Sequence, residues 1–297
     1  MTTTTRTGSL GLQAPASRHP AVDALRRIVI TPVGAVSLAV IVALVFIAVF
    51  ATWIAPYSFR LPSADTFQGP SSVHFLGTDN IGRDTLSRLI QGARVSIYVG
   101  FLTVGFGTLV GACVGLTSGF IGGTADLIIQ RFVDSIQAIP ALILTMAIIS
   151  VIGPSTTNAV LAIAVFVAAS NSRVVRGAVF AVKENVYLEA AEVIGASPLR
   201  RMVRHVLPNV MPPILILISA GFGSAIIIES ALSFLGLATQ RPDVSWGMML
   251  RDGRAFMESQ PGVMLSAGTV IAITVLAFNM LGDVVRDVLD PRLRGSR

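Results

Sequence analysis

The chain has 297 residues, of which 53% are hydrophobic and 13% are charged, and its mean hydropathy is +0.75. This composition is typical of a membrane protein with several spans and excludes a soluble domain. The net charge of +6 does not indicate nucleic-acid binding, because the basic residues lie in loops beside apolar runs. The single cysteine, Cys113, cannot form an intrachain disulfide, and the scattered histidines lack metal-ligand spacing.

The first part of the chain predicts a tail followed by a membrane span. Residues 1–20 are rich in Thr, Ser and Gly, so residues 1–30 are expected to form a disordered cytoplasmic tail. An uncharged run at residues 32–55 exceeds the ~20 residues that cross a ~30 Å hydrocarbon core. A signal peptide would have a shorter apolar core. We therefore expect a retained first span and one transmembrane domain over residues 31–297.

The polar stretch at residues 56–94 predicts an amphipathic helix at the membrane surface. Asp79 is placed to cap this helix, and Asp84 and Arg88 have the i, i+4 spacing of an ion pair. Its glycines do not form a phosphate-binding loop, since no strand precedes them and no GK[ST] follows. The apolar face of the helix would consist of Leu86, Leu89 and Ile90.

A series of glycines at every fourth position starts inside the second predicted span, residues 97–118, and continues just beyond it. Glycines with this spacing lie along one face of a helix, where backbones can approach closely. We interpret the face as a helix-packing surface, with gating or substrate contact as the alternative. Whether the facing helix belongs to this chain or to a second subunit stays open. The glycines are Gly107, Gly111, Gly115, Gly119 and Gly123.

Four further spans bring the predicted total to six, which places both termini on one side of the membrane. A short polar connection with Asp126, Arg131 and Asp134 precedes the third span, in which Pro140 allows a bend. The fifth span is expected to start after a cluster of three prolines. The predicted spans cover about residues 135–152, 157–172, 214–228 and 263–282, and the prolines are Pro208, Pro212 and Pro213.

Two polar residues fall within the later spans. Glu229 stands at the far end of the fifth span, and Asn279 lies inside the sixth. A carboxylate at a helix centre costs roughly 2.5–3.5 kcal/mol in a membrane, so it needs a hydrogen-bond partner, water or a role. We expect a structural hydrogen-bonding role, with lining of a transport pathway as the alternative.

The segment from Asn185 to Pro208 is Arg-rich and polar, and its local chemistry predicts two short helices joined by a tight turn. Asn185 is positioned to cap the first helix. Gly195 stands where the chain must turn left-handed, which glycine does without a Cβ penalty. Ser197 and Pro198 then provide the N-cap and first residue of a second helix, which Pro208 is expected to end.

This segment resembles the EAA loop of ABC importer permeases, the cytoplasmic element that docks on the ATPase subunit. The family pattern is EAA, three residues, Gly, nine residues, a hydrophobic position, one residue, then Leu-Pro. His205 stands at the hydrophobic position, with Val206 beside it, a departure found in the peptide branch of the family. The resemblance implies ATPase coupling by the residues in register, which are Glu189, Ala190, Ala191, Gly195, Leu207 and Pro208.

Four other stretches resemble the C-subunit permeases of dipeptide and oligopeptide importers. They are FLGTDNIGRDTLSRLIQGARVSI, RHVLPN, ESALSFLGL and AFNMLGDVVRDVLDPRLR, and the resemblance extends over residues 74–294. It implies the fold of a type I ABC importer permease in the bacterial inner membrane, with both termini cytoplasmic. The implied partners are a homologous second permease, two ABC ATPases or one fused ATPase, and an extracytoplasmic binding protein.

The resemblance implies that the chain forms half of a translocation path for dipeptides or oligopeptides, while nickel chelates and glutathione are alternative cargoes in the same family. The chain lacks a GxxxxGK[ST] loop and any catalytic constellation, so we expect no enzyme activity and no bound cofactor or metal. ATP and Mg²⁺ are expected on the ATPases. An ion-coupled secondary transporter or channel is the alternative from another class, which the scarcity of charge in the spans disfavours.

The distribution of basic residues predicts which loops face the cytoplasm. With the N-terminus inside, the inner segments hold 15 basic residues and the outer loops hold seven. Basic residues concentrate on the cytoplasmic side of membrane proteins, so this bias agrees with the orientation that the EAA resemblance implies.

Overall fold

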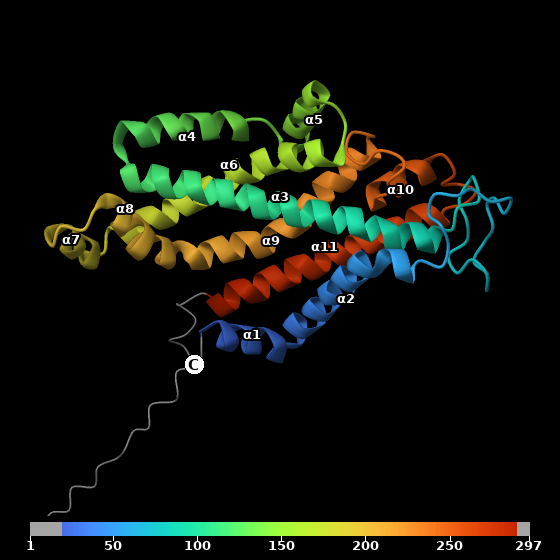
Figure 1. Ribbon diagram of the computed structural model, residues 1–297, viewed down its shortest axis with the longest axis horizontal. Coiled ribbons are helices and arrows are strands. Elements are labelled where there is room, and N and C mark those ends of the chain that lie inside the picture. Colours follow the sequence, from blue (N-terminus) through green and yellow to red (C-terminus); the bar gives the residue numbers. More distant parts are fainter. Residues whose placement is uncertain (1–19, 290–297) are drawn as a thin grey trace, which may run out of the picture.

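The computed structural model describes residues 20–289, with side chains from residue 25 onward. The described chain is helical and contains no β-strand, which confirms the predicted fold class. Four long helices run along the long axis of the molecule, and α2 lies beside α11 at an angle to that axis (Figure 1). These five helices are α2 (Pro32–Ile54), α3 (Thr85–Ile121), α6 (Thr156–Lys183), α9 (Leu207–Phe234) and α11 (Gly262–Leu289).

Five of the described helices are long and apolar enough to cross a membrane, and a bent pair supplies a sixth candidate span. The pair consists of α4 (Gly123–Gln137) and α5 (Ala141–Ile152), which are bent by 91° at the break between them. Pro140 precedes α5 at this break, where the sequence predicts a bend. In Figure 1, α5 accordingly stands across the long axis. The structure thus agrees with six spans when the pair is counted as one.

The predicted polar connection before the third span is wrong, because its charged residues lie within α4. Two of them have cations on α6. Asp126 pairs with Arg176 at 2.5 Å, and Asp134 pairs with Arg173. These ion pairs allow a helix with charged side chains to lie along α6, and the third span therefore begins well before residue 135.

Two helices extend beyond their predicted ends. α3 runs unbroken from Thr85 to Ile121, where the sequence predicts a separate surface helix followed by a span at residues 97–118. α6 continues to Lys183 instead of ending at residue 172. In both cases polar residues that flank the apolar run are held by partners from distant parts of the chain. Hydropathy locates the apolar part of such a helix but not its full length.

The predicted disordered tail at residues 1–30 is also corrected in part. Pro20–Ile30 forms helix α1, which packs against α2 and α11. Leu25, Ile28 and Val29 recur at helical spacing, so this stretch has the period of an amphipathic helix. The earlier part of the predicted tail lies outside the described residues.

Three apolar clusters hold the helices together. The first joins α2, α3, α9 and α11, and it includes Phe222 stacked on Phe278 with ring centroids 4.7 Å apart. The second joins α3, α5, α6 and α9 around the fully buried Ile149 and Ile163. The third joins α3, α6 and the start of α9, and it includes Leu188 of α7 (Val186–Val193). The polar segment between α6 and α9 is thereby attached to the bundle.

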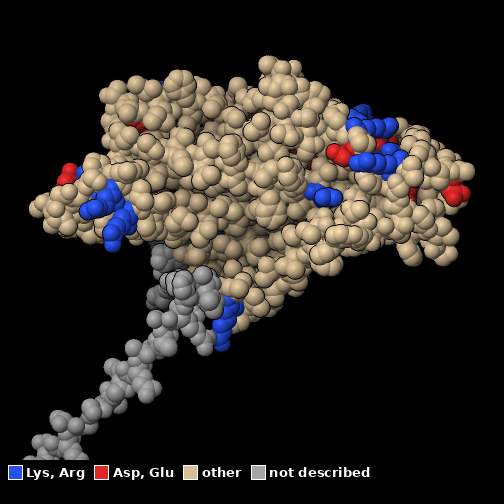
Figure 2. Space-filling model, in the orientation of Figure 1, with Lys and Arg blue, Asp and Glu red and all other residues tan. Residues whose placement is uncertain are grey.

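Most of the charged side chains visible in Figure 2 lie at the two ends of the long axis. One end carries α7 and α8 (Pro198–Arg201), and the other carries α10 (Trp246–Arg254) (Figure 1). We call these the α7 end and the α10 end. A band with few charges between two charged ends suits a protein that crosses a bilayer along its long axis.

Candidate functional site

The segment at the α7 end folds around Gly195, as the sequence predicts. Gly195 follows α7 with a φ of +83°, in the left-handed region. Its N–H donates to the Glu192 carbonyl at 2.9 Å, and the Ala196 N–H donates to the Ala191 carbonyl at 3.0 Å. This pair of bonds is the Schellman arrangement, which satisfies the free carbonyls of a helix C-terminus. We call residues 185–206 the knob.

Of the two predicted helix caps in the knob, one is present and one is not. Asn185 occupies the N-cap position of α7, but its side chain donates to the Val182 carbonyl at 2.8 Å and does not cap the helix. Ser197 caps α8 as predicted, because its hydroxyl accepts the Arg200 N–H at 3.4 Å, and Pro198 is the first helical residue. The second half of the knob therefore has the start that the sequence predicts.

Pro208 does not end the second helix, contrary to the prediction. A π-helical turn, Met202–Val206, follows α8 and leads into α9, with the Leu207 N–H bonded to the Met202 carbonyl. Proline lacks an N–H and interrupts an α-helical ladder. The wider turn before Pro208 accommodates this defect without stopping the helix. The predicted start of the fifth span after the proline cluster is also wrong, since Pro212 and Pro213 lie inside α9.

The inner face of the knob is fastened to α3 and α6. Leu188 is buried against the bundle. Arg201 pairs with Glu192 across the glycine turn, and its guanidinium lies over the Phe120 ring of α3 at 5.9 Å from the centroid. Lys183 of α6 lies over the same ring at 5.8 Å. The knob and the adjoining ends of α3 and α6 therefore form one structural unit.

The outer face of the knob exposes large apolar side chains at a charged end of the molecule. Val193 and Ile194 are 87% and 84% exposed. Beside them lies a groove lined by Ala190, Gly195 and Arg200, among others. An apolar surface with arginines at its edge is typical of a protein contact. The exposed apolar residues of the knob are Val186, Tyr187, Val193, Ile194, Leu199 and Val203.

The predicted coupling residues do not all lie on this outer face. Glu189 is exposed and lines a second hollow, together with Glu192 and Arg201. Ala191 is buried, and Leu207 is half-buried at the start of α9. The sequence pattern therefore combines residues that shape the knob with residues that are free to contact another protein.

The glycine face of α3 packs against α6 of the same chain, which answers the question that the sequence leaves open. A Cβ added at Gly111 would lie 2.6 Å from the carbonyl oxygen of Ala168. A Cβ added at Gly115 would lie 2.3 Å from the carbonyl oxygen of Ser172. Both distances are too short for any side chain, so the two backbones can approach this closely only at glycine.

The outer members of the glycine series behave differently from one another. A Cβ at Gly107 would lie 2.8 Å from Val167, and one at Gly119 would lie 3.0 Å from Val179, so both belong to the packing face. Gly123 does not, because it begins α4 and a Cβ there would meet no atom within 4 Å. The four-residue spacing of the glycines therefore continues beyond the end of α3 and includes one glycine, Gly123, that does not pack against α6.

Glu229 has no exposed surface within this chain. Its carboxylate accepts hydrogen bonds from the Ser233 hydroxyl at 2.7 Å and from the Ser96 hydroxyl of α3 at 3.2 Å. These contacts join α9 to α3 and support the structural hydrogen-bonding role. Asn279 is exposed on α11 and places its side-chain oxygen against Gly223 of α9, where a Cβ would lie 2.4 Å away.

At the α10 end, a buried charge cluster replaces the predicted ion pair. Asp84, and not Asp79, caps α3, since its carboxylate accepts the Ser87 N–H at 2.7 Å. Arg88 instead bonds to Asp79 at 2.6 Å and to Asp252 of α10 at 2.8 Å. The predicted pairing of Asp84 with Arg88 is therefore wrong. Asp252 is 164 residues away from Arg88, so local spacing could not identify it.

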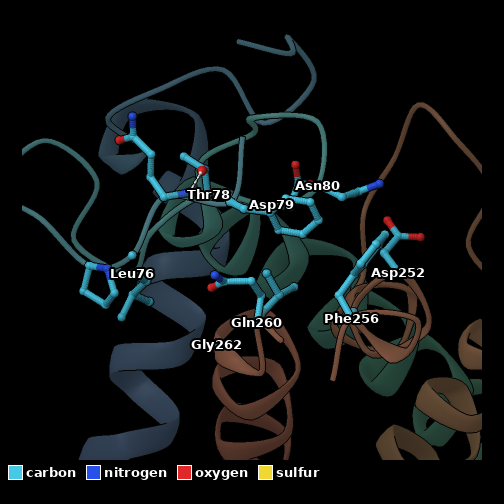
Figure 3. Close-up of a pocket in the computed structure, with 14 residues that line it drawn as sticks. Leu76, Thr78, Asp79, Asn80, Asp252, Phe256, Gln260 and Gly262 are labelled. Atoms are coloured by element: carbon cyan, nitrogen blue, oxygen red, sulfur yellow. Dashed lines mark hydrogen bonds between the residues drawn. The ribbon is translucent and has the colours of Figure 1, made fainter. Parts of the chain in front are cut away.

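The same cluster borders a cleft between the segment before α3 and the connection from α10 to α11 (Figure 3). The Phe67 ring packs edge-on against Phe256 across this cleft, with centroids 4.9 Å apart. Asp79 and Asp252 both pair with Arg83 and Arg88, so their charges are balanced. The cleft therefore lies where the segment before α3 meets the connection from α10 to α11. Its labelled side chains are Leu76, Thr78, Asp79, Asn80, Asp252, Phe256 and Gln260.

Within residues 20–289, no group of three or more His, Cys, Asp and Glu side chains could hold a metal ion. The described chain presents the knob at one end, the charge cluster and cleft at the other, and helices of membrane-spanning length between them.

Comparisons with known proteins identify similar chains. Residues 111–295 match the family described as binding-protein-dependent transport system inner membrane component, and residues 20–70 match the N-terminal TM domain of oligopeptide transport permease C. The dipeptide transport system permease protein DppC of Alkalihalophilus pseudofirmus is 38% identical over 92% of this chain and 90% of its own length. The glutathione transport system permease protein GsiD of Pectobacterium atrosepticum is 38% identical over 86% of this chain and 85% of its own.

Among solved structures, the methionine ABC transporter MetNI in an inward-facing conformation contains a similar chain. The TM-score is 0.57 at 19% sequence identity, and the match covers 68% of this chain and 97% of that chain. At this identity the likeness shows a shared fold.

Proposed function

This chain belongs to the family of binding-protein-dependent transport system inner membrane components, and on that basis we propose that it forms half of the path through which an ABC importer carries peptides. The chain is a multi-pass inner-membrane permease of bacterial type, a transport subunit and not an enzyme. The family match excludes the alternative of an ion-coupled secondary transporter. An importer of this kind works with ATPase subunits, a second permease and a binding protein.

The cargo class rests on one observation, the 38% identity with a dipeptide permease over 92% of this chain. Similarity to a glutathione permease favours glutathione as a second candidate, and glutathione is itself a small peptide. Nickel chelates remain the alternative that the sequence motifs allow. The second permease is proposed to be a homologue of this chain, and the binding protein delivers cargo at the α10 end.

The knob is proposed to be the contact with the ATPases, which are two subunits or one fused chain. Its exposed apolar side chains, the adjacent arginines and the rigid turn at Gly195 support this role. The contact of the Arg201 guanidinium with the Phe120 ring connects the knob to α3, so a displacement of the knob would be transmitted to that helix. ATP and Mg²⁺ would then be bound by the ATPases, and this chain would hold no cofactor.

The proposed cargo is tested by reconstituting the chain with its partner permease, its ATPases and its binding protein in vesicles. We expect ATP-dependent uptake of a radiolabelled dipeptide, and no uptake when this chain is omitted. Uptake of a longer oligopeptide and of glutathione is measured in parallel. If the assembly imports a nickel chelate and none of the three peptides, the proposed cargo class is wrong.

The proposed orientation places the knob and both termini in the cytoplasm, with residues 56–94 and 231–262 outside. Single cysteines introduced by Ser197→Cys and Ser71→Cys, each in a Cys113→Ala background, test this orientation. An impermeant thiol reagent applied to intact cells is expected to label the second variant and not the first. Labelling of Ser197→Cys in intact cells would contradict the topology.

A further inference from the structure

A groove at the α10 end lies beside α2 and α3. It consists of two adjoining hollows that share Arg94 and Tyr98 of α3 as lining residues. The hollow nearer the end of the molecule has a volume of about 620 Å³ and also receives Thr52 of α2 and Thr156 at the start of α6. The second hollow continues along the two helices toward the middle of the bundle. The groove therefore extends from the hollow that contains Arg60 and Asp243 to a hollow formed by α2 and α3 alone.

The outer hollow carries one excess positive charge. Arg60 forms a 3.6 Å ion pair with Asp243, and both line this hollow. Arg94 is exposed and has no carboxylate within ion-pair distance in the part of the chain that the structure describes. Its guanidinium makes a long hydrogen bond of 3.5 Å to the Thr52 hydroxyl. A guanidinium with unused donors is suited to bind a phosphate or carboxylate.

The surroundings of Arg94 place it at the level of the membrane–water interface. Thr52 lies in the last turn of α2, and the neighbouring Trp53 is 78% exposed. Tryptophan is enriched at this level of membrane proteins. Thr156 adds the start of a long helix, whose N-terminal N–H groups also favour anions.

The second hollow is apolar apart from the two residues that it shares with the first. Val49 and Phe101 are 59% and 45% exposed, so a second molecule can contact them. Polarity therefore changes along the groove, from arginines and hydroxyls at the interface to hydrocarbon in the membrane. The apolar lining residues are Val45, Ala48, Val49, Ile97 and Phe101.

We propose that this groove binds a phospholipid of the leaflet at the α10 end, with its phosphate on Arg94 and one acyl chain along Val49 and Phe101. A phospholipid matches both halves of the groove, since it joins an anionic phosphate to a long apolar chain. The carboxylate of a transported peptide would match the outer half, but a peptide has no acyl chain to lie along the inner half. The inference rests on membrane insertion and is independent of the proposed cargo.

The test measures phospholipid that stays bound to the purified complete transporter after extensive washing in mild detergent, by native mass spectrometry. Arg94→Gln is expected to lose the tightly held phospholipid, with binding weakened about tenfold or more because charge-assisted hydrogen bonds are lost. Arg94→Lys keeps the positive charge and is expected to bind the phospholipid, but more weakly than the wild type does. Val49→Trp fills the apolar half of the groove and is expected to lose the phospholipid even though Arg94 is intact.

Two matched variants control for charge and bulk outside the groove. Arg241→Gln removes an arginine that is 63% exposed at the same end, and Val36→Trp adds a ring at an exposed position of α2. Both are expected to retain the phospholipid. To identify the occupant, phosphatidylglycerol, a phosphate-free glycolipid or inorganic phosphate is added separately to delipidated protein, and each is also tested for displacement of bound phospholipid. We expect only phosphatidylglycerol to bind the delipidated protein and to displace the bound phospholipid.

Four results would overturn the proposal. The first is wild-type phospholipid retention in Arg94→Gln. The second is loss of the partner permease from Arg94→Gln with phospholipid unchanged, which would assign Arg94 to a subunit contact. The third is a raised KM for cargo with phospholipid unchanged, which would assign Arg94 to the translocation path. Equal displacement by inorganic phosphate would reduce the site to a small-anion site and would also contradict the proposal.

Discussion

Replacing Gly195 by valine is expected to abolish uptake while the chain remains inserted in the membrane. Gly195 has a φ of +83°, and a β-branched residue held in that region costs about 1–2 kcal/mol or more. A Cβ at this position meets no atom within 4 Å, so the strain comes from the backbone alone. The strain is relieved if the turn opens, and opening the turn changes the angle between α7 and α8.

The measurement is uptake and ATP hydrolysis together, in vesicles that contain the reconstituted transporter. We expect Gly195→Val to lose uptake, either because the ATPases no longer bind or because hydrolysis proceeds without transport. Glu189→Ala is expected to have a milder effect, since Glu189 is exposed and does not shape the turn.

Two controls separate backbone conformation from added bulk. Gly195→Asn is expected to retain most of the uptake, because asparagine tolerates the left-handed region. Gly177→Val adds the same side chain where a Cβ meets no atom within 4 Å, and it is expected to transport normally. If Gly195→Val shows normal uptake and normal substrate-stimulated ATP hydrolysis, the proposal that the knob couples hydrolysis to transport is wrong.

Replacing Gly111 by leucine is expected to destabilise the chain and reduce the yield of assembled transporter severalfold or more. The first atom of any side chain at Gly111 would lie 2.6 Å from a backbone carbonyl of α6. A backbone cannot rotate away as a side chain does, so α3 and α6 must separate. Overpacking of a well-packed interface typically costs about 1–3 kcal/mol.

The measurement is the amount of complex that survives detergent extraction and its thermal stability by size-exclusion chromatography. Gly105→Leu is a matched control on the same helix, since a Cβ at Gly105 meets no atom within 4 Å. Cys113→Leu adds bulk at an exposed position two residues from Gly111. Both controls are expected to assemble normally. Equal yield and stability in Gly111→Leu and the controls would show that the glycine face does not need close packing.

Much of the knob could be predicted from the sequence, because the features that shape it depend on residues close together in the chain. A left-handed turn requires a glycine, and Gly195 stands at that turn. A serine followed by a proline starts a helix, and Ser197 caps α8. The apolar runs predicted the spans for the same reason, since each must match the thickness of a bilayer. The EAA pattern combined these local signals into one recognisable segment.

The errors arose where the deciding partner is distant in the chain. The pairing of Arg88 with Asp252 crosses 164 residues, so the i, i+4 neighbour was chosen instead. Asp126 looked like part of a loop because its partner Arg176 lies 50 residues later on α6. Pro208 looked like a helix end because a sequence does not reveal a π turn that absorbs the defect.

By itself, the sequence determined that this protein crosses the membrane several times, carries a polar segment that turns at a glycine, and has a glycine face on α3 that must pack closely. Each of these follows from the chemistry of residues near one another in the chain. Only the tertiary structure decided that the glycine face meets α6 of the same chain, that the third span is broken by 91°, and that Arg94 stands at the mouth of an apolar groove. These features depend on which helices become neighbours, and that is settled by the packing of the whole bundle.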